Sequence, residues 1–239
     1  MKQKNNKSKL YALIALYIVL YYLWIVIFKD TGRLFIIVSN IFQTVPSLIV
    51  SVVLFKVCMK KHDEKDLFWL IILIGIMINF IGQMTRNYYE IILKVAAPNP
   101  GLPDLFWNIA AILYLIALFY KFHNRIKNRS VITLVIDVMT TMCIAIAITW
   151  VYIVYPLIVN IESLKFMNLL AHITYPVIDL VLLCGVISLY VSLQKDDIER
   201  KYIFKAILSF FILFISNSIY TYIYTMGNYR TGNFVDPLW

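Results

Sequence analysis

Residues Asn79 to Asp104 read NFIGQMTRNYYEIILKVAAPNPGLPD and join two apolar segments of the chain. Four polar or charged residues recur at helical spacing in the first segment, so their side chains fall on one face of a helix; they are Asn79, Gln83, Arg86 and Glu90. Polar side chains in a membrane-spanning helix are costly and usually face a bundle interior or a wet cavity. The loop that follows is rich in Pro and Gly, and Asp104 opens the next apolar segment with Trp107 one turn later.

The composition of the chain is that of a membrane protein. Hydrophobic residues make up 62% of its 239 residues, charged residues 15%, and the mean hydropathy is +0.79. Apolar segments of about 20 residues, long enough to cross a bilayer as helices, fill nearly all of the chain. We therefore predict a single domain over residues 1–239, an all-α polytopic transmembrane helix bundle. Its seven predicted spans are residues 10–28, 34–59, 67–92, 104–122, 131–155, 167–194 and 202–226.

Basic residues are distributed unevenly between the two sides of these spans. Sixteen of the 22 lie on the side that holds the N-terminal arm and the loops after the second, fourth and sixth spans. The positive-inside rule places that side in the cytoplasm, so we predict a multi-pass cell-membrane protein with a cytoplasmic N-terminus. Because the charges are spread over short loops, we expect the lipid bilayer and no nucleic acid as a partner. The other side holds Lys29, Arg33, Arg86, Lys94, Lys165 and Arg230.

The sequence pattern predicts a repeat of paired helices, an arrangement that is common in membrane proteins. An outgoing span ends in aromatic residues, and a returning span follows that is marked by Pro and by Asp104, Asp179 or Asp236. The final residues, Asp-Pro-Leu-Trp at 236–239, match the start of the returning span at Asp104. Asp and Pro are favoured at helix starts. We therefore predict that an eighth span begins here and that the chain is the truncated membrane part of a longer protein.

The repeated carboxylates admit a structural and a functional interpretation. For Asp104 and Asp236 we favour helix capping, which a carboxylate at a helix start provides. Asp179 lies deeper in its span, and a polar pocket and a structural pairing are equally supported there. His172 and Tyr175 share its helix face, and His172 is expected to be a hydrogen-bonded structural histidine, with a pH-sensitive role as the lesser option.

Arg86 and Glu90 are spaced to pair with each other along one helix. An interfacial ion pair is the favoured interpretation, and the alternative is that Arg86 anchors an anionic group or pairs with Asp179 or Asp104. Together these residues form a predicted ligand-binding set on the outer side. Its members are Asn79, Gln83, Arg86, Glu90, Asp104, Trp107, His172, Tyr175, Asp179 and Asp236.

The sequence contains no motif for a nucleophilic, metallohydrolase, phosphate-loop or redox-dithiol site. Its three cysteines have no metal-ligand spacing, and its single histidine outside the cytoplasmic loops does not suffice for a metal or haem site. We therefore predict no cofactor, no metal and no catalytic residue within this segment, which is not expected to be an enzyme.

Three short motifs mark the outer ends of the spans: Asn-Tyr-Tyr-Glu at 87–90, Tyr-Pro-x-x-Asp at 175–179 and Asp-Pro-Leu-Trp at 236–239. With these motifs the paired helices resemble the N-terminal multi-span sensory regions of bacterial GGDEF and EAL signalling proteins. The resemblance covers spans three to seven and the tail. It implies a bacterial protein that reads an external or membrane cue in an outward-opening pocket. It also implies that a cytoplasmic cyclic di-GMP output domain, which this chain does not contain, follows the membrane region. A homodimer would form through that domain.

Two other classes remain open at this point. A small transporter or channel would line a path with Asp179, Arg86 and Asn79. An intramembrane enzyme acting on a lipid would use Asp179 and His172 as an acid–base pair.

Overall fold

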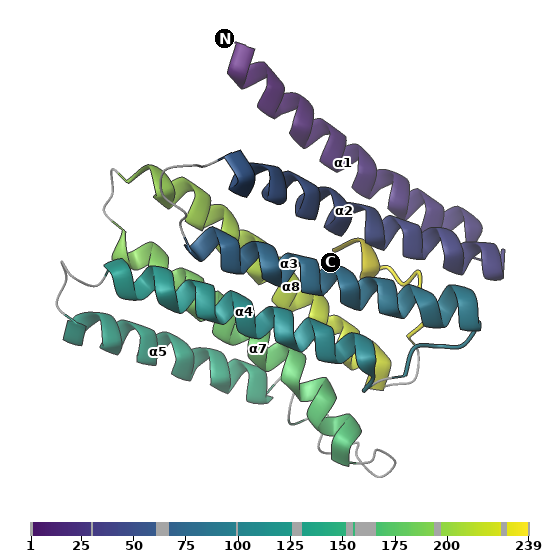
Figure 1. The fold of residues 1–239 in the computed structure, drawn as a ribbon. Coiled ribbons are helices and arrows are strands. Elements are labelled where there is room, and N and C mark those ends of the chain that lie inside the picture. The colour runs from purple at the N-terminus through teal and green to yellow at the C-terminus, as the bar shows by residue number, and fades with distance from the viewer. Residues whose placement is uncertain are drawn as a thin grey trace.

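The protein is a bundle of long helices, as its computed structural model shows (Figure 1). The structure describes residues 2–29, 31–60, 67–98, 100–125, 131–151, 155, 166–193, 197–225 and 229–238, and these contain no strand. The predicted all-α bundle is thereby confirmed. The helices are α1 (Lys2–Phe28), α2 (Arg33–Lys60), α3 (Leu67–Asn87), the π-helix η1 (Tyr88–Leu93), α4 (Leu102–Arg125), α5 (Val131–Thr149), α7 (Phe166–Ser192), α8 (Ile198–Thr225) and the 3-10 helix η5 (Asp236–Leu238).

Each of the seven predicted spans corresponds to one long helix. Within the described residues, six helices are long and apolar enough to cross a membrane, so the protein is a multi-pass membrane protein. The remaining long helix, α5, has an apolar stretch at Ile136–Ile148 that is shorter than these six. The largest difference from the predicted boundaries is at the N-terminus, where the polar arm is helical because α1 begins at Lys2. Helix α5 also ends at Thr149, earlier than the predicted residue 155, and α8 begins at Ile198, before the predicted residue 202. A helix can continue past its apolar stretch, since its backbone hydrogen bonds are made within the segment itself.

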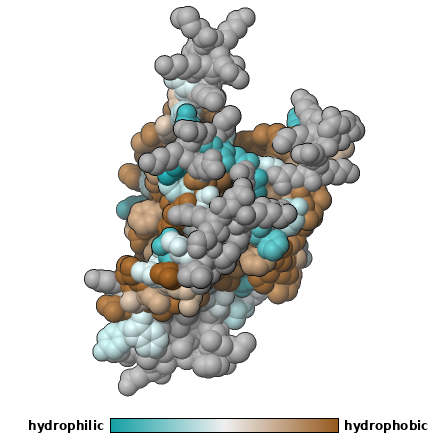
Figure 2. Space-filling view, turned by 90° about the vertical axis from the view of Figure 1, so that its left-hand side faces the viewer, coloured by the Kyte–Doolittle hydropathy of each residue, from teal (hydrophilic) through white to brown (hydrophobic). Residues whose placement is uncertain are grey.

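The helices are arranged so that their apolar side chains face both inward and outward. Helix α3 packs mainly on α4, α7 packs on α4, α5 and α8, and α1 lies at one edge beside α2 (Figure 1). Large apolar side chains such as Val26 and Phe119 are 70% and 71% exposed, which suits contact with lipid. Hydrophobic residues also cover much of the periphery in the end-on view, with hydrophilic residues nearer the middle (Figure 2).

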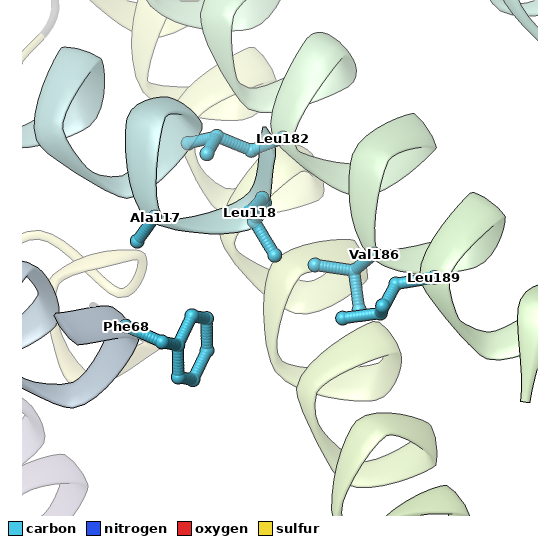
Figure 3. Close-up of a cluster of buried hydrophobic side chains, with 6 residues drawn as sticks. All are labelled: Phe68, Ala117, Leu118, Leu182, Val186 and Leu189. Atoms are coloured by element: carbon cyan, nitrogen blue, oxygen red, sulfur yellow. The ribbon is translucent and has the colours of Figure 1, made fainter. Parts of the chain in front are cut away.

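A compact apolar core lies among α3, α4 and α7. Six buried side chains form it (Figure 3), namely Phe68, Ala117, Leu118, Leu182, Val186 and Leu189. They come from the start of α3 and the ends of α4 and α7, so this core lies at one end of the bundle. The opposite end, where α1 turns into α2 and η1 leads into α4, is polar inside and is called the cavity end below.

Helices α3 and α4 approach closely because glycines on α3 face large rings on α4. A Cβ atom on Gly75 would lie 2.5 Å from the Tyr114 ring, and one on Gly82 would lie 2.7 Å from Nε1 of Trp107. Small residues that permit such contact are typical of helix interfaces in membranes. Gly82 thereby positions Trp107, one of the predicted site residues.

Replacing Gly75 with Leu is expected to push α3 and α4 apart and to destabilise the protein by about 1–3 kcal/mol, as overpacking does. Unfolding of the purified protein in detergent measures this change. Ile74→Leu is the matched control, because Ile74 is 42% exposed beside Gly75. Equal stability of the Gly75→Leu protein and the control would show that α3 and α4 do not pack in this way.

Candidate functional site

A seam of amide and hydroxyl side chains joins α2 to α3 near the cavity end. Nε2 of Gln83 donates to Oε1 of Gln43 at 3.3 Å and to Oδ1 of Asn87 at 3.2 Å. Nδ2 of Asn87 donates to Oγ1 of Thr44 at 2.7 Å. Polar groups removed from water in this way are costly unless they are hydrogen-bonded, and here they satisfy one another. Gln83 is therefore a member of the α2–α3 seam.

Arg86 and Glu90 form the predicted ion pair, with Nε of Arg86 2.9 Å from Oε1 of Glu90. Each side chain is only 8% exposed, so the pair is buried and does not extend outward into the membrane interface. Glu90 Oε2 also accepts hydrogen bonds from Nδ2 of Asn40 at 2.7 Å and from Oγ1 of Thr231 at 2.8 Å. The alternative pairing of Arg86 with Asp179 or Asp104 is not seen among the described residues, where Arg86 donates to Glu90 on η1 and to two residues of the C-terminal segment.

The C-terminal segment, residues 229–238, folds back onto the ion pair. Nη2 of Arg86 donates to the hydroxyl of Tyr229 at 2.8 Å and to Oγ1 of Thr231 at 3.2 Å. Val235 and Asp236 in this segment are 0% and 2% exposed. The segment is thus an integral part of the cavity end, joined to α3 across a large distance in the sequence.

Asp236 is the buried anchor of this segment. Its Oδ2 atom accepts from Nε2 of Gln43 at 2.8 Å and from the backbone N–H groups of Gly232 at 2.7 Å and Asn233 at 3.1 Å. Its Oδ1 atom accepts from the Tyr229 hydroxyl at 3.1 Å. Burial raises the pKa of Asp236 to about 6, against the opposing effect of the Arg86 guanidinium.

The carboxylate of Asp236 has contacts that the helix-capping interpretation did not include. The residue begins the three-residue helix η5, and its carboxylate is used within the folded segment and by Gln43. The eighth span, whose start this motif was predicted to mark, stays a prediction, because Asp and Pro start short 3-10 turns as well as long helices. Trp239, the last residue of that motif, lies outside the described residues.

Asp104 supports the start of α4, though from a different position than expected. The helix begins at Leu102, so Asp104 is its third residue, and its Oδ2 atom accepts from the backbone N–H of Gly101 at 2.7 Å. An acidic side chain reaching back to the helix start in this way resembles one half of a capping box. Its Oδ1 atom accepts from the hydroxyl of Tyr175, which ties α4 to α7.

Asp179 lies apart from these groups and pairs α7 with α8. Its Oδ2 atom accepts from Nδ2 of Asn217 at 2.6 Å, and the side chain is buried. This contact is the structural pairing that the sequence left open. Asn217 was missed, although an amide in the middle of an apolar span was a signal that could have identified it. Asn79 is partly buried on α3, and His172 lies on α7 at a position whose side chain is not described.

The cavity end of the bundle, where α1 turns into α2 and η1 leads into α4, contains an open cavity of about 490 Å³. Its wall includes four of the predicted site residues, and these are Arg86, Glu90, Asp104 and Trp107. The structure does not bring all ten predicted residues together: Gln83 and Asp236 belong to the adjoining polar network, and Asp179 is not in the described part of the wall. The sequence did not identify the contributions of the α1–α2 turn and of Tyr229, Arg230 and Thr231.

One wall of the cavity is aromatic. The rings of Tyr220 and Tyr229 meet edge to face with centroids 4.6 Å apart, and Tyr224 lies 5.8 Å from Tyr220 and 6.4 Å from Tyr229. Burial raises the pKa of the Tyr229 phenol, so this hydroxyl is neutral and can donate to Asp236 while it accepts from Arg86. The arrangement places ring faces and charged groups around the same cavity.

Comparison with protein-family models, with curated proteins and with solved structures yields no match to this chain. Within the described residues there is no group of three or more His, Cys, Asp and Glu side chains placed to hold a metal ion. Its function therefore has to be inferred from the cavity and the groups that surround it.

Proposed function

We propose that the chain is a membrane-embedded sensory domain that binds a small ligand in the cavity. The main support for this sensory role is that residues from many separate elements form the cavity wall. The α1–α2 turn, α2, η1, the loop before α4, α4 itself, α8 and the C-terminal segment all contribute to it. A ligand there touches elements far apart in the sequence, so it favours one arrangement of them over others. A volume of about 490 Å³ also lies within the range of small-molecule sites, roughly 300–1,000 Å³.

The C-terminal segment supplies a route by which binding is relayed. Tyr229, Arg230 and Thr231 line the cavity, and the same segment is held by Arg86 and Gln43. A ligand that changes these contacts changes how firmly the segment is docked. Order–disorder changes and shifts of a segment are established ways of transmitting a signal.

The wider setting follows from the basic loops and from the resemblance to GGDEF and EAL proteins. We propose a bacterial cell membrane, a cytoplasmic N-terminus and a cavity that opens away from the cytoplasm. The output is then a cytoplasmic cyclic di-GMP domain of the whole protein, which would also form the homodimer. Within the described residues, Asp179 is bonded to Asn217 and not to a group in the cavity wall, so the contacts described there do not favour the lipid-enzyme alternative.

Filling the cavity tests the sensory role. Ala97 lies in the wall and is partly buried, so Ala97→Trp occupies ligand space. In cells that produce the whole natural protein, this substitution is expected to change the cyclic di-GMP level by about twofold or more. The reason is that it shifts the balance between the arrangement of the cavity end with ligand and the arrangement without it. Mass spectrometry of cell extracts measures the level.

Ala12→Trp is the control, since Ala12 is exposed on α1 away from the cavity wall. It should leave cyclic di-GMP at the wild-type level. If both variants insert normally and both leave the level unchanged, the cavity has no role in cyclic di-GMP signalling.

A further inference from the structure

The charged residues of the cavity wall are unbalanced. Among the described residues of the wall, four are basic and two are acidic, and they are Lys29, Arg86, Lys94, Arg230, Glu90 and Asp104. In the sequence, this side of the spans carries only six Lys and Arg residues, so most of its basic charge gathers at this one cavity. An excess of two positive charges in a concave site attracts anions.

Both carboxylates and Arg86 are already engaged by the protein. Glu90 accepts from Arg86, Asn40 and Thr231, and Asp104 accepts from Gly101 and Tyr175. These groups therefore hold the wall together.

Three basic side chains remain available at the cavity. Lys29, Lys94 and Arg230 are exposed, and none has a carboxylate partner in the described part of the chain. They come from the α1–α2 turn, from the end of η1 and from the C-terminal segment. An anion held among them would join three elements that are separate in the sequence.

Lys94 has an unusual backbone. Its φ of 60° is the one positive value of a non-glycine residue in the described part of the chain, and its N–H donates to the Tyr89 carbonyl. Such a conformation is unfavourable for a residue with a Cβ atom, although it is common where a helix ends. It ends η1 at the point where the chain turns along the cavity wall, so that Lys94 itself and the residues after it line the cavity.

The remaining wall suits an apolar group. Trp107, Tyr220 and Tyr224 present rings, and Val95, Ala97 and Pro103 present aliphatic surface. A volume of about 490 Å³ is far more than an inorganic phosphate ion fills, whereas a headgroup with an attached apolar part fits the range of drug-sized ligands.

We propose that the ligand is an anionic amphiphile. Its phosphate or carboxylate group lies among Lys29, Lys94 and Arg230, and its apolar part lies against Trp107, Tyr220 and Tyr224. This inference rests on the proposed function, since it names the chemical class that the sensory cavity accepts. The same chemistry is offered by an anionic phospholipid of the membrane and by a free amphipathic phosphate.

Binding of dodecyl phosphate to the purified chain in phosphatidylcholine nanodiscs tests the proposal, with dodecyltrimethylammonium as the cationic probe of equal chain length. Thermal unfolding and native mass spectrometry both report binding. The expected result is that dodecyl phosphate stabilises the protein more than the cationic probe does. A triple variant, Lys29→Gln with Lys94→Gln and Arg230→Gln, is expected to bind dodecyl phosphate about tenfold or more weakly, since three charge contacts are lost.

The matched control removes three exposed lysines outside the cavity wall, by Lys9→Gln, Lys56→Gln and Lys201→Gln. This control should bind like the wild type, which separates the site from general attraction to a basic protein. The proposal is overturned if the triple variant binds as tightly as the control, or if the cationic probe binds better than dodecyl phosphate.

Ala97→Trp distinguishes failure of the ligand class from failure of the cavity. If it blocks the cationic probe while the triple variant does not weaken dodecyl phosphate, the cavity binds ligands but the anionic class is wrong. If it affects neither probe, ligands do not enter this cavity and the sensory proposal fails as well.

A second series, in nanodiscs that contain phosphatidylglycerol, identifies the source of the anion. Loss of the dodecyl phosphate effect there means that the lipid occupies the site, and its persistence means that a free amphiphile does. Both results agree with an anionic ligand.

Discussion

Replacing Arg86 with Met is expected to destabilise the protein by about 3–5 kcal/mol, because the substitution leaves a buried carboxylate without its counter-charge. The side chains of Arg86 and Glu90 are each 8% exposed, so water does not readily take over the solvation of Glu90. The loss extends to the C-terminal segment, since Arg86 also donates to Tyr229 and Thr231. Chemical unfolding of the purified protein in detergent measures the change.

Two further variants separate the ion pair from general damage. Removing both charges, by Arg86→Met together with Glu90→Met, should restore part of the lost stability, because no unpaired buried charge then remains. Arg33→Met is the control: this exposed arginine donates to the Ile91 carbonyl at the same end of the bundle, and about 1 kcal/mol or less is expected from its loss. Glu90→Met alone completes the cycle: if the double variant loses as much stability as Arg86→Met and Glu90→Met lose in sum, the two residues are not coupled.

The second large effect is expected at Gly232. Its φ is +87°, and a Cβ atom there would lie 2.1 Å from Cε1 of Phe35. Gly232→Val therefore combines an unfavourable left-handed backbone with a collision against α2. Since the Gly232 N–H is also a donor to Asp236, the whole segment 229–238 should leave its docked position. Hydrogen exchange of this segment should then approach that of an unfolded peptide.

Gly32 offers a matched control for backbone strain alone. Its φ is +63°, but a Cβ atom there meets no atom within 4 Å. Gly32→Val should cost only the strain of a left-handed residue, about 1–2 kcal/mol, and should leave exchange in segment 229–238 slow. Slow exchange in the Gly232→Val protein would contradict the docking of this segment against Phe35.

The sequence was sufficient for the helices because a membrane span is determined locally. A run of about 20 apolar residues satisfies its own backbone hydrogen bonds and needs no distant partner to be identified. The same local argument found the Arg86–Glu90 pair, since residues four apart on a helix are neighbours. It also marked the face that carries Gln83, which the structure places against α2.

The tertiary part of the site could not be inferred in this way. Asp236 contacts Gln43 across almost the whole chain, and no local pattern specifies which buried donors a carboxylate will meet. Its Asp-Pro motif fits the start of a long helix and of a short 3-10 turn alike. The cavity wall likewise depends on segments that meet only after folding, and the positive φ of Lys94 has no sequence signal, unlike a glycine.

The proposed sensing of an external cue requires that the cavity opens on the outer side of the membrane. An Arg230→Cys variant, made after replacing Cys58, Cys143 and Cys184 with Ser, places one thiol at the exposed edge of the cavity. A membrane-impermeant maleimide applied to intact cells should label it, whereas Lys201→Cys at the other end should react only after the cells are permeabilised. The reverse pattern, with Arg230→Cys labelled only in permeabilised cells, would place the cavity in the cytoplasm and contradict the proposed sensing of an external cue.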